Sequence, residues 1–190
     1  PVFVYAANMG IDVKSVVEES GYSYEYLANP LNRTSWECLG KVFDGIQKAG
    51  VTDSQFVEIG KSTITSPLFA DLPFRHEVLK VEEFYEYVHS PEEGLVSYFL
   101  TNVIPHSGWV EDLYCITLKL KDGYPKIPQL WLTSLGVVKA LPTIGGLPEI
   151  KVDMAEIENG VAYYFDLKPI AQKDLQLPNV YDVMGKQPAA

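Results

Sequence analysis

The spacing of apolar residues divides the chain into a helical first half and a β-rich second half. The most regular helical pattern consists of Trp36, Leu39, Phe43 and Ile46. Intervals of three and four residues place these side chains on one helix face, and Gly50 ends the helix. Similar spacing and capping residues predict further helices over residues 2–8, 13–20, 22–27, 53–64 and 78–88.

Polar residues at the predicted helix starts specify the caps. Asp12 stands at the start of the helix predicted over 13–20, and Asp53 stands at the start of the helix predicted over 53–64. Thr34 or Ser35 can cap the central helix, and Glu37 follows Thr34 by three residues, which is the spacing of a capping box. The first half is therefore predicted to be a set of short, individually capped helices.

Alternating apolar and polar residues predict strands in the second half. Residues 95–103 and 114–121 have strand character, whereas residues 130–141 have helical composition. Two further alternating runs, 150–154 and 161–167, flank an Asn-Gly pair, which is a strong hairpin signal. The predicted fold class is α+β, in which an N-terminal helical part precedes a roughly four-stranded antiparallel sheet with one inserted helix.

A two-residue Asn159-Gly160 loop fixes the register expected for this hairpin. It pairs Glu158 with Val161, Glu156 with Tyr163, Met154 with Phe165, Asp153 with Asp166, and Val152 with Leu167. The two aspartates would repel each other, so a bulge is expected there. Glu156 either reaches water at the end of the sheet or enters a ligand pocket and bonds to Tyr163.

Length and charge bound the class of protein. With 190 residues, 47% of them hydrophobic, the chain is long enough for one folded domain with a core. We expect a single domain over 1–168, mainly helical over 1–90 and built from sheet plus helix over 91–168, followed by a linker or tail over 169–190. A net charge of -10 disfavours a nucleic-acid partner.

The cysteines and the hydropathy pattern indicate a cytoplasmic protein. Cys38 and Cys115 lie far apart without metal or redox spacing, so each is expected to be a free thiol in a reducing compartment. No apolar run approaches the roughly 20 residues of a membrane span. We therefore expect no membrane association.

No contiguous catalytic or metal-binding motif is present in the sequence. The Gly-x-Ser-x-Gly elbow, the phosphate loop and the Gly-x-Gly-x-x-Gly turn are all missing. His76-Glu77 begins like a zinc-protease helix, but Lys80 stands where the second histidine should be. His89 and His106 are likewise unpaired in sequence, so we predict no catalytic and no metal-ligating residues.

Aromatic residues offer the one candidate site, because several fall where helices and sheet should meet. An apolar cavity with tyrosine hydroxyls could orient a small molecule there, although the same residues could simply fill the core. The predicted ligand-binding residues are Tyr85, Tyr98, Trp109, Tyr114, Ile116, Trp131, Glu156, Tyr163 and Phe165.

Three segments resemble a known family of sensory domains. The run from Gly21 to Glu37, with its Tyr-Ser-x-Glu-Tyr-Leu-x-Asn-Pro core, is similar to the N-terminal segment of bacterial input domains. Residues 59–61 (Ile-Gly-Lys) and 141–148 (Leu-Pro-Thr-Ile-Gly-Gly-Leu-Pro) resemble later segments of that family. The family comprises the input domains of hybrid histidine kinases and related regulators, and its plan is similar to the heme-nitric-oxide-binding and V4R sensory fold.

The resemblance implies a regulatory module over residues 1 to about 168. Such a module binds an unknown small molecule or partner and controls an attached output domain such as a histidine kinase, with a homodimer expected. No cofactor is predicted: heme is conceivable, but the Tyr-x-Ser-x-Arg signature of the heme branch is missing. The alternatives are an interaction or dimerisation module without a ligand, and an enzyme built from scattered residues such as Glu156, Tyr163 and His106.

Overall fold

The computed structural model describes residues 2–29, 32, 34–64, 99–105, 113–145 and 148–166. Its described helices are α1 (Val2–Asn8), α2 (Val13–Glu19), α3 (Tyr24–Ala28), α4 (Trp36–Lys48), α5 (Asp53–Ile64), α8 (Pro128–Ala140) and the 3-10 helix η1 (Leu141–Gly145). Its described strands are β1 (Phe99–Pro105), β2 (Leu113–Leu120), β3 (Val152–Ile157) and β4 (Gly160–Asp166). The predicted α+β class is confirmed. The predicted helix over 78–88 and the start of the strand predicted over 95–103 lie outside the described residues.

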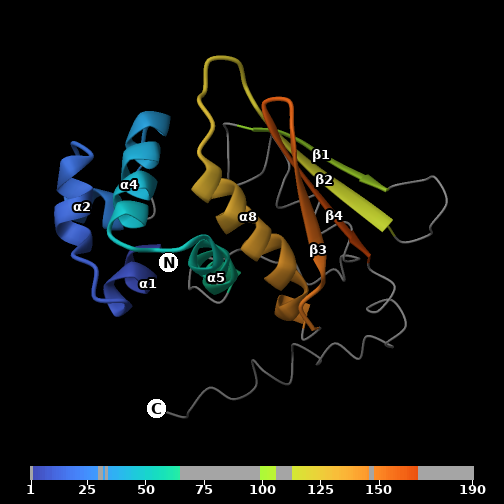
Figure 1. Ribbon diagram of the computed structural model, residues 1–190, viewed down its shortest axis with the longest axis horizontal. Helices are drawn as coiled ribbons and strands as arrows, with labels where there is room; N and C mark the ends of the chain where they lie inside the picture. The colour runs from blue at the N-terminus through green and yellow to red at the C-terminus, as the bar shows by residue number, and fades with distance from the viewer. Residues whose placement is uncertain are drawn as a thin grey trace, which may run out of the picture.

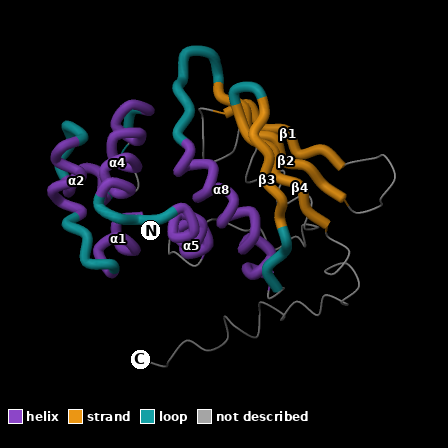
Figure 2. Tube along the Cα trace, viewed as in Figure 1, coloured by secondary structure: helices purple, strands orange, loops and turns teal. Residues whose placement is uncertain are grey.

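The elements form a helical part and a sheet part, with α8 between them (Figure 1). Helices α1, α2 and α4 lie together, and the four strands lie on the opposite side of α8 (Figure 2). The strands form one antiparallel sheet in the order β1-β2-β4-β3. The predicted four-stranded sheet with one inserted helix is therefore confirmed.

The caps show which polar residues start the helices. Asp12 caps α2 as expected, because its side chain accepts a hydrogen bond from Ser15 N–H. Of the two caps expected for α4, Ser35 is confirmed, because its side chain accepts from Cys38 N–H; the capping box from Thr34 is therefore wrong. Glu37 is left free to bind Lys41 at 2.8 Å instead.

The cap expected at the start of α5 is also displaced by one residue. Asp53 is the first residue of α5, and Thr52 precedes it. Gln55 Oε1 accepts a 2.8 Å hydrogen bond from Thr52 N–H, which satisfies a donor just before the helix. The start of α5 therefore depends on hydrogen bonds between Thr52 and Gln55.

The hairpin register differs from the expected one by two residues. Ile157 pairs with Gly160, and Met154 pairs with Tyr163 rather than with Phe165. The turn is Glu158-Asn159, with Asn159 at a φ of 55°, a conformation that asparagine tolerates well. The pairs expected for Val152, Asp153, Glu156 and Glu158 are therefore corrected: Val152 faces Phe165, Asp153 faces Tyr164, Glu156 faces Val161, and Glu158 lies in the turn.

The physical reason for this register is the position of Gly160 inside the sheet. A Cβ atom on Gly160 would lie 2.1 Å from the carbonyl oxygen of Leu118, so only glycine allows β2 to approach here. Because the shift is an even number of residues, the same side chains still share a face. The expected bulge is not needed, since Asp153 does not face Asp166.

Two glycines set the contact between α5 and α8. A Cβ atom on Gly60 would lie 1.9 Å from Thr133 O, and one on Gly136 would lie 1.9 Å from Val57 O. The helices therefore touch backbone to backbone. This crossing joins the helical part to the helix that covers the sheet.

Candidate functional site

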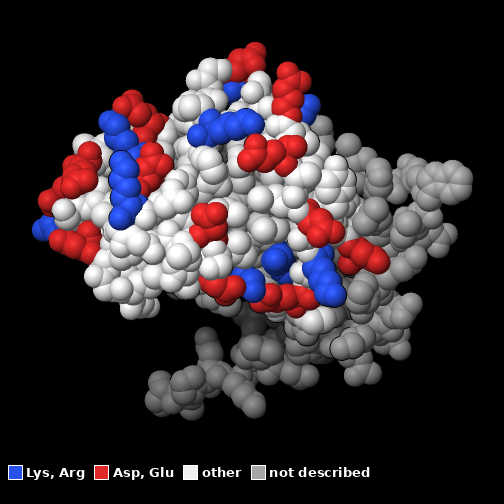
Figure 3. Space-filling view, in the orientation of Figure 1, with Lys and Arg blue, Asp and Glu red and all other residues white. Residues whose placement is uncertain are grey.

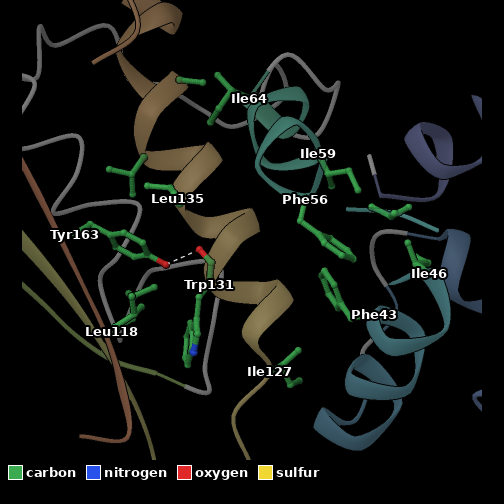
Figure 4. Close-up of a cluster of buried hydrophobic side chains, with 14 of the residues drawn as sticks. Phe43, Ile46, Phe56, Ile59, Ile64, Leu118, Ile127, Trp131, Leu135 and Tyr163 are labelled. Atoms are coloured by element: carbon green, nitrogen blue, oxygen red, sulfur yellow. Dashed lines mark hydrogen bonds between the residues drawn. The ribbon is translucent and has the colours of Figure 1, made fainter. Parts of the chain in front are cut away.

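The inner face of the sheet is the face covered by α8. Tyr163 of β4 is fully buried there, and its hydroxyl donates a 2.8 Å hydrogen bond to the carbonyl oxygen of Trp131 in α8 (Figure 4). Leu118 and Leu135 pack beside this pair. Burial raises the pKa of Tyr163, which keeps the hydroxyl protonated and able to donate.

Four of the predicted ligand-binding residues are brought together on this face. Ile116 and Tyr163 face each other across β2 and β4, as do Tyr114 and Phe165. The ring of Tyr114 stacks on that of Phe165, with centroids 5.9 Å apart. Ile116, Tyr163 and Phe165 are at most 2% exposed, whereas Tyr114 is half-buried. Of these four residues, Tyr114 is therefore the most exposed.

Trp131 joins the same cluster from the helix side. Trp131 is 2% exposed, and its backbone carbonyl accepts the hydrogen bond from the Tyr163 hydroxyl. Neighbouring positions of α8 that face the interior, Leu135 and Val138, are also buried. Trp131 of α8 therefore joins the four predicted residues of β2 and β4 through its bond with Tyr163.

Glu156 does not join this cluster. It shares the inner side of the sheet with Val161 but is exposed, and its carboxylate lies 3.6 Å from Lys126 Nζ. Of the two interpretations weighed for Glu156, the structure agrees with the one in which it reaches water at the end of the sheet. The other interpretation, a bond to Tyr163, is wrong, because the Tyr163 hydroxyl bonds to Trp131.

Three further predicted residues, Tyr85, Tyr98 and Trp109, lie outside the described residues. The ligand-binding role of the whole predicted set stays a prediction. The described part of the face supplies a stacked aromatic pair and a satisfied tyrosine hydroxyl. Such a surface suits an apolar or aromatic molecule better than a charged one.

Polar contacts that the sequence did not reveal tie α8 to α4. The side chain of Gln129 is 5% exposed, and its Nε2 donates to Gln47 Oε1 at 2.6 Å and to Asp44 Oδ1 at 3.1 Å. Trp36 Nε1 donates at 2.7 Å to Pro125 O in the loop before α8. These partners are 82 to 89 residues apart in the chain, so no local pattern predicts them.

Heme needs an axial ligand, and histidine is a common one. The described residues contain no histidine, since His76, His89 and His106 all lie outside them. Burial raises the pKa of Tyr163, so its hydroxyl, which donates to Trp131 O, stays protonated. Cys38 is buried with its Sγ 3.4 Å from Ser20 Oγ. The described residues therefore contain no histidine that could hold heme.

Other classes of site can be compared with the described part of the chain. Within it, no group of three or more His, Cys, Asp or Glu side chains could hold a metal ion. Likewise, none of its helices is long and apolar enough to cross a membrane. On the face seen in Figure 3, Lys and Arg side chains are interspersed with Asp and Glu and form no continuous basic surface.

Comparisons with known proteins give a fold but no sequence relative. No protein-family model matches the chain, and no curated protein matches it. A structure from a study of heme distortion in the H-NOX family is similar with a TM-score of 0.57 at 12% identity, covering 82% of this chain and 84% of that one. A point mutant of the T. tengcongensis H-NOX protein gives 0.55 at 12% identity, covering 81% and 85%.

A mutant of a second H-NOX protein, named Cs H-NOX, is similar to the same extent. Its TM-score is 0.56 at 13% identity, and the match covers 81% of this chain and 84% of that one. Identities this low carry information on the fold and not on the ligand. The described helices and sheet therefore have the fold of H-NOX domains, which confirms the likeness to the heme-nitric-oxide-binding sensory fold that the sequence indicates.

Proposed function

We propose that the chain is a signal-sensing regulatory domain that binds a small apolar molecule and controls an attached output domain, such as a histidine kinase, in the cytoplasm. The observation that carries this proposal is the H-NOX-like fold, which extends over about four fifths of the chain. The domain acts by binding rather than by catalysis. The proposal does not depend on heme.

The ligand enters from the Tyr114 end of the inner face. Tyr114 is half-buried there, whereas Ile116 and Tyr163 are buried and the Tyr163 hydroxyl bonds to Trp131 O. A ligand stacked on Tyr114 and Phe165 would contact both β2 and β4, and β4 is one of the two strands that α8 contacts. Aromatic contacts of this kind contribute about 0.5–1.5 kcal/mol each beyond area burial.

The signal leaves through α8. Its carbonyl at Trp131 is bonded to Tyr163, and its backbone at Gly136 touches α5. If a ligand displaces α8, α5 must either move with it or resist the movement. The two helices touch through backbone atoms, so no side chain between them can change rotamer to take up the displacement. A ligand that prefers one packing of α8 over another shifts the population of the two packings.

A second function, an interaction or dimerisation module without a ligand, also has an observation in its favour. Ile116, Trp131 and Tyr163 are at most 2% exposed, so the described centre of the face is already filled by side chains. In this alternative the fold presents a surface and has no cavity.

Measuring the Tm of the intact chain in the presence of a library of apolar and aromatic molecules distinguishes the two functions. Heme is included in the library, and an absorption spectrum also reports its binding. A ligand at 100 times its Kd adds about 2.7 kcal/mol, which raises Tm by roughly 5–10 °C. Tyr114→Leu removes the shift, and Tyr26→Leu, at an exposed tyrosine of α3, retains it. If no compound shifts Tm, or if Tyr114→Leu leaves the shift intact, ligand sensing at this face is wrong.

A further inference from the structure

Strand β3 has a free edge in the described part of the sheet. It is the last strand in the order β1-β2-β4-β3, so it pairs only with β4 (Figure 1). An edge strand presents unpaired N–H and C=O groups that can bind another strand. The edge of β3 is therefore a candidate interaction surface.

One hydrogen bond fixes which backbone groups point outward. Leu120 N–H donates to Asn159 O at 2.8 Å, so the β2–β4 pairs formed by Val161, Tyr163 and Phe165 are the hydrogen-bonded ones. Along β4 the remaining residues must bond to β3, and their partners are Asp153, Ala155 and Ile157. The backbone groups of Val152, Met154 and Glu156 consequently point away from the sheet.

The side chains along this edge are mostly exposed. Met154 is 39% exposed although it lies on the inner side of the sheet opposite the buried Tyr163. Asp153, Ala155 and Glu156 are exposed as well. Charged residues on an edge discourage pairing, but only in registers that bring like charges together.

Like charges exclude most ways of pairing β3 with a second copy of itself. In a two-fold symmetric antiparallel pair, one residue faces its own copy. An axis at Asp153 or Glu156 places two carboxylates opposite each other. An axis at Val152 or Ile157, the two ends of the strand, leaves most of β3 beyond the partner strand.

The two remaining registers differ in what faces Met154. An axis at Ala155 places Met154 opposite Glu156, whereas an axis at Met154 brings the two exposed thioethers together. The second register also puts Asp153 opposite Ala155 and Glu156 opposite Val152, so no like charges face each other. We propose that the chain forms a homodimer in which β3 pairs with β3 of a second copy, with Met154 facing Met154.

The two four-stranded sheets then become one continuous sheet. The outward N–H and C=O groups of Val152, Met154 and Glu156 are satisfied, and the exposed part of Met154 is buried against its counterpart. The interface lies at the edge opposite β1 and leaves the Tyr114 end of the inner face accessible.

The first test is the oligomeric state of the whole chain, measured by sedimentation from low micromolar to a few hundred micromolar protein. We expect a reversible dimer in wild type. Met154→Lys places two ammonium groups opposite each other and should raise the dimer Kd at least tenfold. Met9→Lys is the matched control, because Met9 is 37% exposed near the end of α1. A monomeric wild type, or equal Kd values for the two variants, overturns the proposal.

The second test fixes the register and does not depend on the stability of Met154→Lys. Facing residues of a pair that is not hydrogen-bonded have Cα atoms about 4.5 Å apart, within the range of a disulfide. In a Cys115→Ser background, a mixture of Asp153→Cys and Ala155→Cys chains should therefore form a mixed disulfide dimer on oxidation. A dimer from Ala155→Cys alone shows the rejected register. No crosslinked dimer in any mixture contradicts strand pairing altogether.

Discussion

The crossing of α5 and α8 makes a sharp prediction for Gly136→Ala. The added carbon would lie 1.9 Å from Val57 O and 2.9 Å from Lys61 N, whereas ordinary contacts begin at 3.4 Å. The helices would have to separate by roughly 1.5 Å, because both obstacles are backbone atoms that no rotamer change can move. Gly60→Ala meets Thr133 O at the same 1.9 Å and should behave alike.

The size of the effect follows from two opposing terms. Overpacking in a core costs about 1–3 kcal/mol, and contact with backbone belongs at the upper end of that range or above it. Alanine recovers up to about 1 kcal/mol of helix propensity. The expected net loss is about 2 kcal/mol or more, which lowers Tm by roughly 4–8 °C in a protein of this length.

Urea unfolding followed by circular dichroism measures this loss, and Gly40→Ala is the matched control. Gly40 also lies inside a helix, α4, but its added carbon would meet only side-chain atoms of Ile127, the nearer of them at 3.6 Å. This control should be as stable as wild type or up to about 1 kcal/mol more stable. Equal stability of Gly136→Ala and Gly40→Ala would refute the backbone contact between α5 and α8.

Two further variants test the contacts on either side of α8. Tyr163→Phe removes the hydroxyl that bonds to Trp131 O and should cost about 1 kcal/mol in urea unfolding. Since burial raises the pKa of Tyr163 in the folded state, its stabilisation is complete below the ordinary tyrosine pKa of about 10 and is lost as pH rises further. Tyr163→Phe should lose less stability than wild type between pH 9 and 11, and an equal loss would show that Tyr163 is not the group responsible. Trp36→Phe removes the 2.7 Å bond to Pro125 O and should likewise cost about 1 kcal/mol, whereas wild-type stability would mean that this bond does not hold the loop.

Features encoded by short-range pattern were predicted from the sequence. The face of α4 needs only the spacing of Trp36, Phe43 and Ile46, and all three are buried. The alternation over β2 likewise places Ile116 and Leu118 inward. Both patterns reflect a helix or strand with one buried side, which local spacing reports directly.

The hairpin register could not be read from local signals. Asn159-Gly160 looks like a loop because both residues favour left-handed backbone. In the fold only Asn159 has that backbone, and Gly160 is used instead for its missing side chain beside Leu118. That requirement comes from β2, some 40 residues earlier in the chain. A glycine has several physical uses, and the hairpin sequence alone does not distinguish them.

The sequence predicted which residues of the candidate site share a face, but not the hydrogen-bond partner of Tyr163. Alternation places Tyr114, Ile116, Tyr163 and Phe165 on one face, and they do meet. The partner of the Tyr163 hydroxyl is a backbone carbonyl, which has no residue signature, so Glu156 was considered instead. The glycine pair at the α5–α8 crossing was also missed, because backbone contact between helices depends on tertiary packing.

The central claim is that binding at the inner face controls an output activity. Its most direct test uses a ligand found by thermal shift and the natural protein that carries this domain. The output activity is measured with and without that ligand, in wild type and in Tyr114→Leu. The account predicts a ligand-dependent change in wild type that Tyr114→Leu abolishes. An activity that is the same with and without a bound ligand would contradict it.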